Sequence, residues 1–121
     1  MPPRDWRLRI EDMLDAARAI AGFVGEFIES SDIDAFARDR KTVDAVVRNL
    51  EVIGEAARHV PESIRTRFPD VPWADIVGMR SVLIHEYFGV DFEILWQTIQ
   101  NDLPALAQRL ESILEETSPP E

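Results

Sequence analysis

Apolar residues recur every three or four positions along nearly the whole chain, and this spacing limits the possible folds more than any other feature. An α-helix turns once in 3.6 residues, so side chains with this spacing lie on one face. Between residues 5 and 29, for example, that face carries Ile10, Met13, Ile20 and Val24. We find no run that alternates polar and apolar residues as a half-buried strand does. The sequence therefore predicts an all-α protein, an antiparallel bundle of four to five helices.

Capping residues, glycine and proline divide this pattern into segments. Pro61 cannot continue a helix interior, and Gly89 is a suitable helix stop. Asp91 is an N-cap candidate for the last helix, which Pro104 should kink or split. The expected helical segments are 5–29, 32–36, 39–59, a short turn within 61–73, 74–88 and 91–114. We expect residues 1–116 to form a single helical domain and residues 117–121 to form a frayed tail.

Composition narrows the possible functions. A chain of 121 residues is one domain, and without cysteine it has neither disulfides nor a thiolate metal site. The sequence shows no charged and apolar leader and no apolar run of about 20 residues. A cytoplasmic protein without membrane contact is the expectation.

The net charge of −10 argues against broad binding of nucleic acid. The excess acid is concentrated near the C-terminus, because Arg109 is the only lysine or arginine after residue 80. Arg58, Arg65, Arg67 and Arg80 can therefore still form a local positive site. A solvated charged face is the alternative for the first three.

The stretch "GMRSVLIHEY", residues 78–87, places Arg80, His85 and Tyr87 in one predicted helix. At about 100° per residue, Arg80 and Tyr87 lie within roughly 20° of each other, whereas His85 lies about 140° from Arg80. One ideal helix therefore does not bring the arginine and the histidine together easily. Two copies meeting across a two-fold axis would let each histidine approach the other copy's arginine.

Histidine can accept or donate a proton near neutral pH, and arginine binds and stabilises a phosphate. The pair suits cleavage of RNA through attack of the 2′-hydroxyl on the adjacent phosphorus, without a metal. The alternatives are a structural His-x-Tyr pair and an ordinary arginine salt bridge. A metal site is not expected, because His59 and His85 are far apart and no ligand motif accompanies them.

The order Arg-x4-His-x-Tyr, within "IGEAARHVPESIRTRFPDVPWADIVGMRSVLIHEYFGVDFEILWQTIQNDLP", resembles the HepT family of HEPN-domain toxins. The likeness extends from the first helix to Leu114. It implies an all-helical HEPN fold, a homodimer with a cleft at the paired motifs, and a metal-independent endoribonuclease that uses Arg80 and His85 as catalytic residues. It also implies a toxin-antitoxin system whose second component is an MntA-type minimal nucleotidyltransferase.

In this family the antitoxin transfers AMP from ATP onto the motif tyrosine, here Tyr87. The resemblance thus assigns ATP and Mg²⁺ to the partner and no cofactor to this chain. An added nucleotide would place negative charge and bulk near His85, where an RNA phosphate must bind, and would switch the toxin off.

Two further positions have supporting roles in this interpretation. Ser81 stands where many family members have a polar residue, often asparagine, so its smaller hydrogen-bonding capacity can lower nuclease activity. Glu55 can hold Arg80 in place, and a helix salt bridge to Arg58 or Arg48 is the alternative.

Two questions stay open at this point. Trp73 and Trp96 are expected as core or dimer anchors, with stacking on an exposed base as the alternative.

The alternative function for the whole protein is a non-catalytic helical subunit that binds a nucleotide or phosphate and partners a nucleotidyltransferase.

Overall fold

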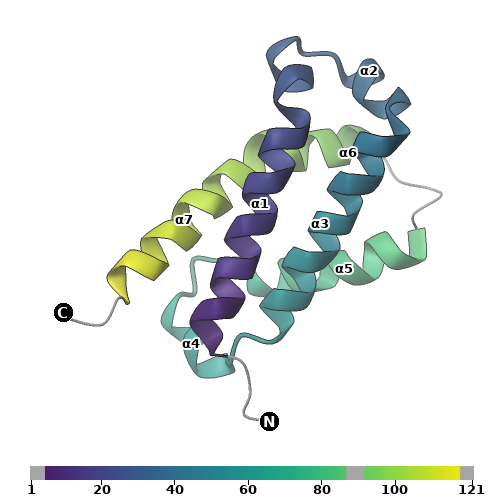
Figure 1. Ribbon diagram of the computed structural model, residues 1–121. Helices are drawn as coiled ribbons and strands as arrows, with labels where there is room; N and C mark the ends of the chain where they lie inside the picture. The colour runs from purple at the N-terminus through teal and green to yellow at the C-terminus, as the bar shows by residue number, and fades with distance from the viewer. Residues whose placement is uncertain (1–4, 87–91, 118–121) are drawn as a thin grey trace.

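The computed structural model describes residues 5–86 and 92–117, and for residues 80–86 it describes the backbone alone (Figure 1). Four long helices make up most of the described part: α1 (Trp6–Glu29), α3 (Arg40–Arg58), α5 (Trp73–Glu86) and α7 (Leu103–Glu116). Shorter elements join them: α2 (Ile33–Arg38), α4 (Glu62–Arg67), α6 (Phe92–Gln97) and the π-helical turn η2 (Thr98–Asp102). No strand occurs within these ranges, and the predicted all-α bundle is confirmed.

Aspartate caps begin the first three helices at the predicted places. The carboxylates of Asp5, Asp32 and Asp39 accept hydrogen bonds from backbone N–H groups two or three residues ahead, at 2.8, 2.9 and 3.2 Å. Each cap satisfies a donor that the first turn of a helix leaves without a partner. Between α1 and α2 the chain turns at Ser31, whose φ of 52° lies in the left-handed region. Hydrogen bonds between neighbouring residues therefore account for where α1, α2 and α3 begin.

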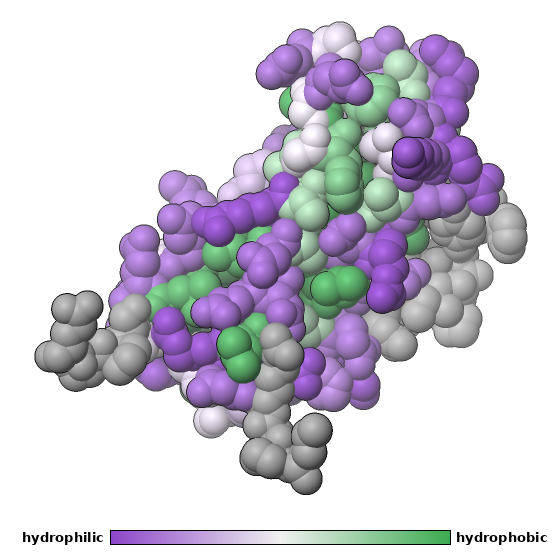
Figure 2. Space-filling view, viewed as in Figure 1, coloured by the Kyte–Doolittle hydropathy of each residue, from purple (hydrophilic) through white to green (hydrophobic). Residues whose placement is uncertain are grey.

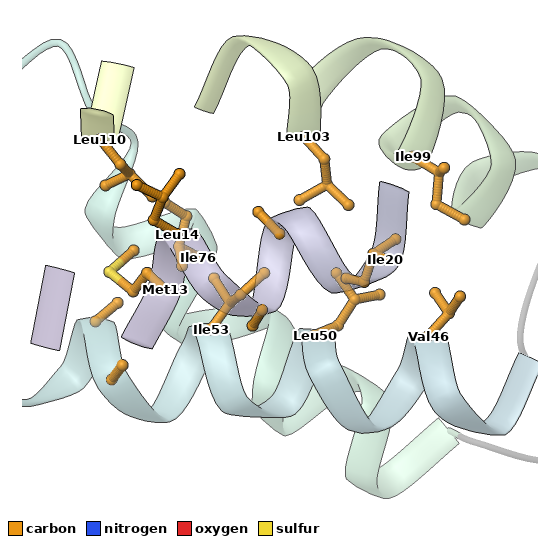
Figure 3. Packing of buried hydrophobic residues seen from close by; sticks show 14 of the residues in the cluster. Met13, Leu14, Ile20, Val46, Leu50, Ile53, Ile76, Ile99, Leu103 and Leu110 are labelled. Atoms are coloured by element: carbon orange, nitrogen blue, oxygen red, sulfur yellow. The ribbon is translucent and has the colours of Figure 1, made fainter. Parts of the chain in front are cut away.

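The hydrophobic core lies between α1 and α3, which run side by side in Figure 1. Met13, Ile20, Leu50 and Ile53 are completely buried there, as the close-up in Figure 3 shows. Helix α5 packs against α3, whereas α7 packs against α1 and contributes the buried Leu110. The bundle is thus built on a central helix pair, with α5 and α7 each resting on a different member of that pair.

The two tryptophans Trp73 and Trp96 belong to this core. Trp73 is buried, and its indole Nε1 donates a hydrogen bond to the carbonyl oxygen of Phe68 at 2.9 Å. Trp96 is also buried, with its ring centroid 5.6 Å from that of Phe36. The prediction of core anchors is confirmed, and a buried indole is not available to stack on an exposed base.

The last helical region is continuous, but the π-helical turn η2 interrupts its α-helical hydrogen bonding between α6 and α7. Pro104 lacks an N–H group and stands in the first turn of α7, directly after the π-helical turn η2. Before the π-helical turn, Leu95 and Trp96 point into the core, but Ile94 is 65% exposed. The apolar spacing of the last helical segment predicts that Ile94 is buried together with Leu95. That prediction is wrong, because Ile94 lies about 160° from the buried Trp96 around the helix.

The surface carries its apolar side chains in small groups. On the face shown in Figure 2, hydrophobic residues form narrow strips between hydrophilic ones. Leu8 and Phe23 on α1 are the large apolar side chains exposed on that helix, at 40% and 43%. Among the helices of the described ranges, none combines the length and the apolar character needed to cross a bilayer.

Candidate active site

Helix α5 carries the predicted catalytic positions. Its backbone is α-helical from Trp73 to Glu86, so Arg80, Ser81 and His85 lie on one uninterrupted helix. Regular helix geometry then separates Arg80 from His85 by about 7.5 Å along the axis and about 140° around it. The structure confirms that the two positions share a helix.

The first half of α5 is held firmly in the bundle. The Trp73 side chain binds the carbonyl oxygen that precedes the helix, as described above. Ile76 is buried, and Figure 3 shows it beside Met13 and Leu14 of α1. Because α5 also packs along α3, the helix that carries the motif has a fixed direction. The predicted catalytic positions follow directly in its second half.

Several predicted features fall outside the described residues. Tyr87, the expected site of AMP attachment, lies there, as do the helix stop Gly89 and the N-cap candidate Asp91. The tail beyond residue 117 is outside as well, so its predicted fraying stays a prediction.

Glu55 lies on α3, the helix against which α5 packs. Its Oε1 accepts a hydrogen bond from Arg58 at 2.9 Å and lies 3.0 Å from Nε2 of His59. The hydrogen bond to Glu55, followed by its negative charge, raises the pKa of Arg58. The helix salt bridge with Arg58 is therefore present, whereas Arg48 pairs with Glu51 at 3.8 Å. A role for Glu55 in holding Arg80 stays a prediction.

Two of the other candidate arginines of a positive site make contacts within the protein. Arg58 is paired with Glu55, and the guanidinium carbon of Arg67 lies 5.3 Å from the ring centroid of Phe68. Arg65 is half-buried on the short helix α4. Phosphate binding by Arg80 stays a prediction, because its side chain lies outside the described atoms.

Metal ligands do not gather in the described part of the chain. Within residues 5–86 and 92–117, no three histidine or acidic side chains lie close enough to hold a metal ion together.

A contact that the sequence did not reveal joins the link before α5 to α7. Nε and Nη2 of Arg109 donate to the two carboxylate oxygens of Asp70, at 2.6 and 3.3 Å. Arg109 also binds Glu116 at 3.2 Å and lies 5.5 Å over the ring of Phe68. Asp70 and Arg109 are 39 residues apart, so no local spacing rule indicates their pairing. This ion pair connects the link that precedes α5 to helix α7.

The Asp70–Arg109 pair gives the protein a pH-dependent contribution to stability. The hydrogen bond from Arg109 lowers the pKa of Asp70 below its usual 3.8. A lowered folded-state pKa stabilises the protein above the unfolded-state pKa, and this contribution is lost as the pH falls through the folded-state value. We expect Asp70→Asn to lower the free energy of unfolding slightly near neutral pH, with the difference from wild type shrinking below about pH 4. Urea unfolding at several pH values measures it.

The matched control for that experiment is Asp15→Asn. Asp15 is exposed on α1 and forms no ion pair with another residue of the described ranges, so its replacement removes the same charge without that contact. An Asp70→Asn effect that is constant from neutral to acidic pH would show that the ion pair is not its cause.

The fold and the motif together define a class: a helical bundle in which an arginine and a histidine stand five positions apart on one helix. The profile of a known family, described as "Ribonuclease HepT-like", matches residues 13–113, which include all of α3 and α5. The chain belongs to this HepT-like family.

Relatives named as ribonucleases match most of the chain. A protein of Thermococcus cleftensis named "Probable ribonuclease HepT" is 38% identical, over 86% of this chain and 91% of its own length. A protein of Methanocaldococcus jannaschii named "Putative RNase" is 36% identical, over 93% of this chain and all of its own length. A protein of Caldanaerobacter subterraneus, also named "Putative RNase", is 41% identical over 77% of this chain and 83% of its own length. No solved structure matches the chain.

Proposed function

We propose that this chain is the toxin of a prokaryotic toxin-antitoxin system, a metal-independent endoribonuclease that acts as a homodimer. The observation that carries the proposal is the placement of Arg80 and His85 on one continuous helix inside the region that matches the HepT-like family. Relatives named as ribonucleases cover nearly the whole chain, which supports RNA as the substrate.

The two side chains have complementary roles in this reaction. The His85 imidazole takes the proton from a ribose 2′-hydroxyl, and the 2′-oxygen attacks the adjacent phosphorus. The bond from phosphorus to the 5′-oxygen then breaks, and the leaving oxygen receives a proton from an imidazolium. Arg80 binds the phosphate and stabilises the charge that grows on its oxygens. The products are a 2′,3′-cyclic phosphate and a free 5′-hydroxyl.

Helix geometry favours a site shared by two chains. A separation of about 140° directs Arg80 and His85 of one helix toward different sides, which makes it difficult for both to reach one phosphate. Two α5 helices related by a two-fold axis would bring the histidine of each chain toward the arginine of the other. The proposed active site is thus a cleft between protomers.

We further propose that a nucleotidyltransferase antitoxin of the MntA type silences the toxin by attaching AMP to Tyr87. The tyrosine follows His85 by two positions, so an attached nucleotide would place a phosphodiester charge close to the phosphate site. ATP and Mg²⁺ belong to the antitoxin's reaction.

The test is cleavage of end-labelled RNA by purified protein that mass spectrometry shows to be free of AMP. We expect cleavage to persist in EDTA and to leave 2′,3′-cyclic phosphate ends. Cleavage that EDTA abolishes and Mg²⁺ restores would contradict the metal-independent mechanism. Complete absence of cleavage would instead favour the alternative, a non-catalytic subunit that binds nucleotide or phosphate.

A further inference from the structure

A groove of about 560 Å³ opens between the start of α5 and the region where η2 passes into α7. Because α5 packs on α3 while α7 packs on α1, the two helices border this groove from opposite sides. One wall is formed by residues spaced three or four positions apart: Thr98, Asn101, Asp102, Ala105, Leu106 and Arg109. This spacing extends the wall over about 16 Å of helix axis.

The facing wall repeats the same spacing along α5 and the link before it. Its lining residues are Pro72, Asp75, Ile76 and Met79. Rows of side chains three and four positions apart form the ridges between which a neighbouring helix packs. The groove therefore has the length and the ridged walls that a third helix of about three turns requires.

The interior of the groove is apolar. Leu103 and Ile76 form buried parts of it, while Met79 and Leu106 are half-exposed and Ala105 is exposed. A helix that lays apolar side chains here would remove these surfaces from water, which is the main source of affinity in such interfaces.

The edges of the groove are acidic. Asp70, Asp75 and Asp102 lie on it, and Arg109 is the basic residue among those that line it. Arg109 already pairs with Asp70 and Glu116, so its charge is balanced inside the protein. Within the described residues Asp75 and Asp102 form no ion pair and can attract an outside cation.

The π-helical turn η2 contributes to this surface directly. It supplies Thr98, Asn101 and Asp102 to the groove wall, ahead of Pro104. Such single turns occur frequently at functional sites.

We propose that this groove binds a basic amphipathic helix of another protein, with apolar side chains on the groove floor and lysine or arginine beside Asp75 and Asp102. RNA does not suit these acidic edges. A second copy that packed groove against groove would place like charges together, which is unfavourable. Met79 lies next to Arg80 in the chain, so a helix bound here would lie beside the proposed active site. The proposal does not depend on nuclease activity.

A selection experiment on the intact protein tests this proposal. It uses a displayed library of helical peptides of about 14 residues in which the surface positions of the helix are randomised. We expect the enriched peptides to carry apolar residues with three- and four-residue spacing, flanked by lysine or arginine. Ala105→Trp should weaken the binding of a selected peptide at least tenfold, because the exposed alanine is replaced by a ring that fills the groove. Asp75→Asn with Asp102→Asn should weaken it about fivefold, more at low salt.

Matched variants control for general effects. Ala21→Trp puts the same ring on an exposed position of α1, and Glu11→Gln with Asp15→Asn removes the same charge from α1. Both should leave binding unchanged, with circular dichroism confirming the fold of every variant. The proposal is overturned if no peptide is enriched, if the enriched peptides lack basic residues, or if Ala105→Trp binds them normally. Displacement of the peptide by single-stranded RNA, or loss of self-association in Ala105→Trp, would also overturn it by assigning the groove to another occupant.

Discussion

Replacement of His85 by alanine is expected to lower the rate of RNA cleavage by about 10²- to 10⁴-fold, the usual contribution of a positioned proton-transfer group. The variant lacks the side chain that we propose takes and returns the proton, and it retains the arginine that we propose binds the phosphate. RNA should therefore still bind with little change in affinity. Single-turnover cleavage of end-labelled RNA measures the rate, and fluorescence anisotropy measures the affinity.

The chain provides a matched control in its other histidine. His59 is an exposed residue at the end of α3, paired with Glu55, and has no role in the proposed reaction. His59→Ala should retain most of the cleavage activity. Equal loss of cleavage in both variants, or full activity in His85→Ala, would contradict the catalytic assignment.

The same pair of measurements distinguishes the two proposed functions. A nuclease loses rate but keeps affinity when its proton-transfer group is removed. A non-catalytic subunit that uses His85 to hold phosphate would show no cleavage at all and weaker binding in the variant. Growth arrest on expression of the wild-type chain alone, absent for His85→Ala, would support the nuclease within cells.

Helix starts were the most predictable part of the fold because their cause is local. At Asp5, Asp32 and Asp39 the side chain binds a backbone N–H group only two or three residues away. The same holds for the core face of α1, where periodic spacing alone predicts the buried Met13 and Ile20. Interactions within one or two helical turns can be recognised in a sequence without knowledge of the rest of the fold.

Features that depend on distant parts of the chain were not predictable in this way. The Asp70–Arg109 pair joins residues 39 positions apart, and the groove exists only because α5 and α7 rest on different helices. The exposure of Ile94 depends on which face of α6 packs against the rest of the bundle. A proline at position 104 indicated an interruption, but whether the chain kinks or forms a π-helical turn is decided by packing.

The candidate site falls between these two cases. Its presence on one helix follows from local spacing, and the backbone of α5 bears this out at Arg80 and His85. The proposed approach of a histidine to an arginine across a two-fold axis would instead be a property of two chains. It depends on surface complementarity that spacing within one helix does not encode.

Replacement of Tyr87 by phenylalanine is expected to abolish attachment of AMP by the proposed nucleotidyltransferase antitoxin. Transfer requires the phenolic oxygen, which attacks the α-phosphorus of ATP and releases pyrophosphate. Phenylalanine keeps the ring but has no oxygen to attack. Because Tyr87 is the only tyrosine of the chain, no second phenol can accept the group. Incubation with the antitoxin, Mg²⁺ and ATP labelled in the α-phosphate measures the transfer.

The position of the label identifies the reaction. Wild-type protein should become labelled from α-labelled ATP and not from γ-labelled ATP, since adenylylation retains the α-phosphate whereas phosphorylation would retain the γ-phosphate. Tyr87→Phe should cleave RNA like the unmodified wild type, because the phenol takes no part in proton transfer. It should also stay active after incubation with antitoxin and ATP, whereas the wild type loses cleavage as AMP accumulates near His85. Inhibition of Tyr87→Phe by antitoxin without ATP would show that binding, rather than modification, silences the toxin.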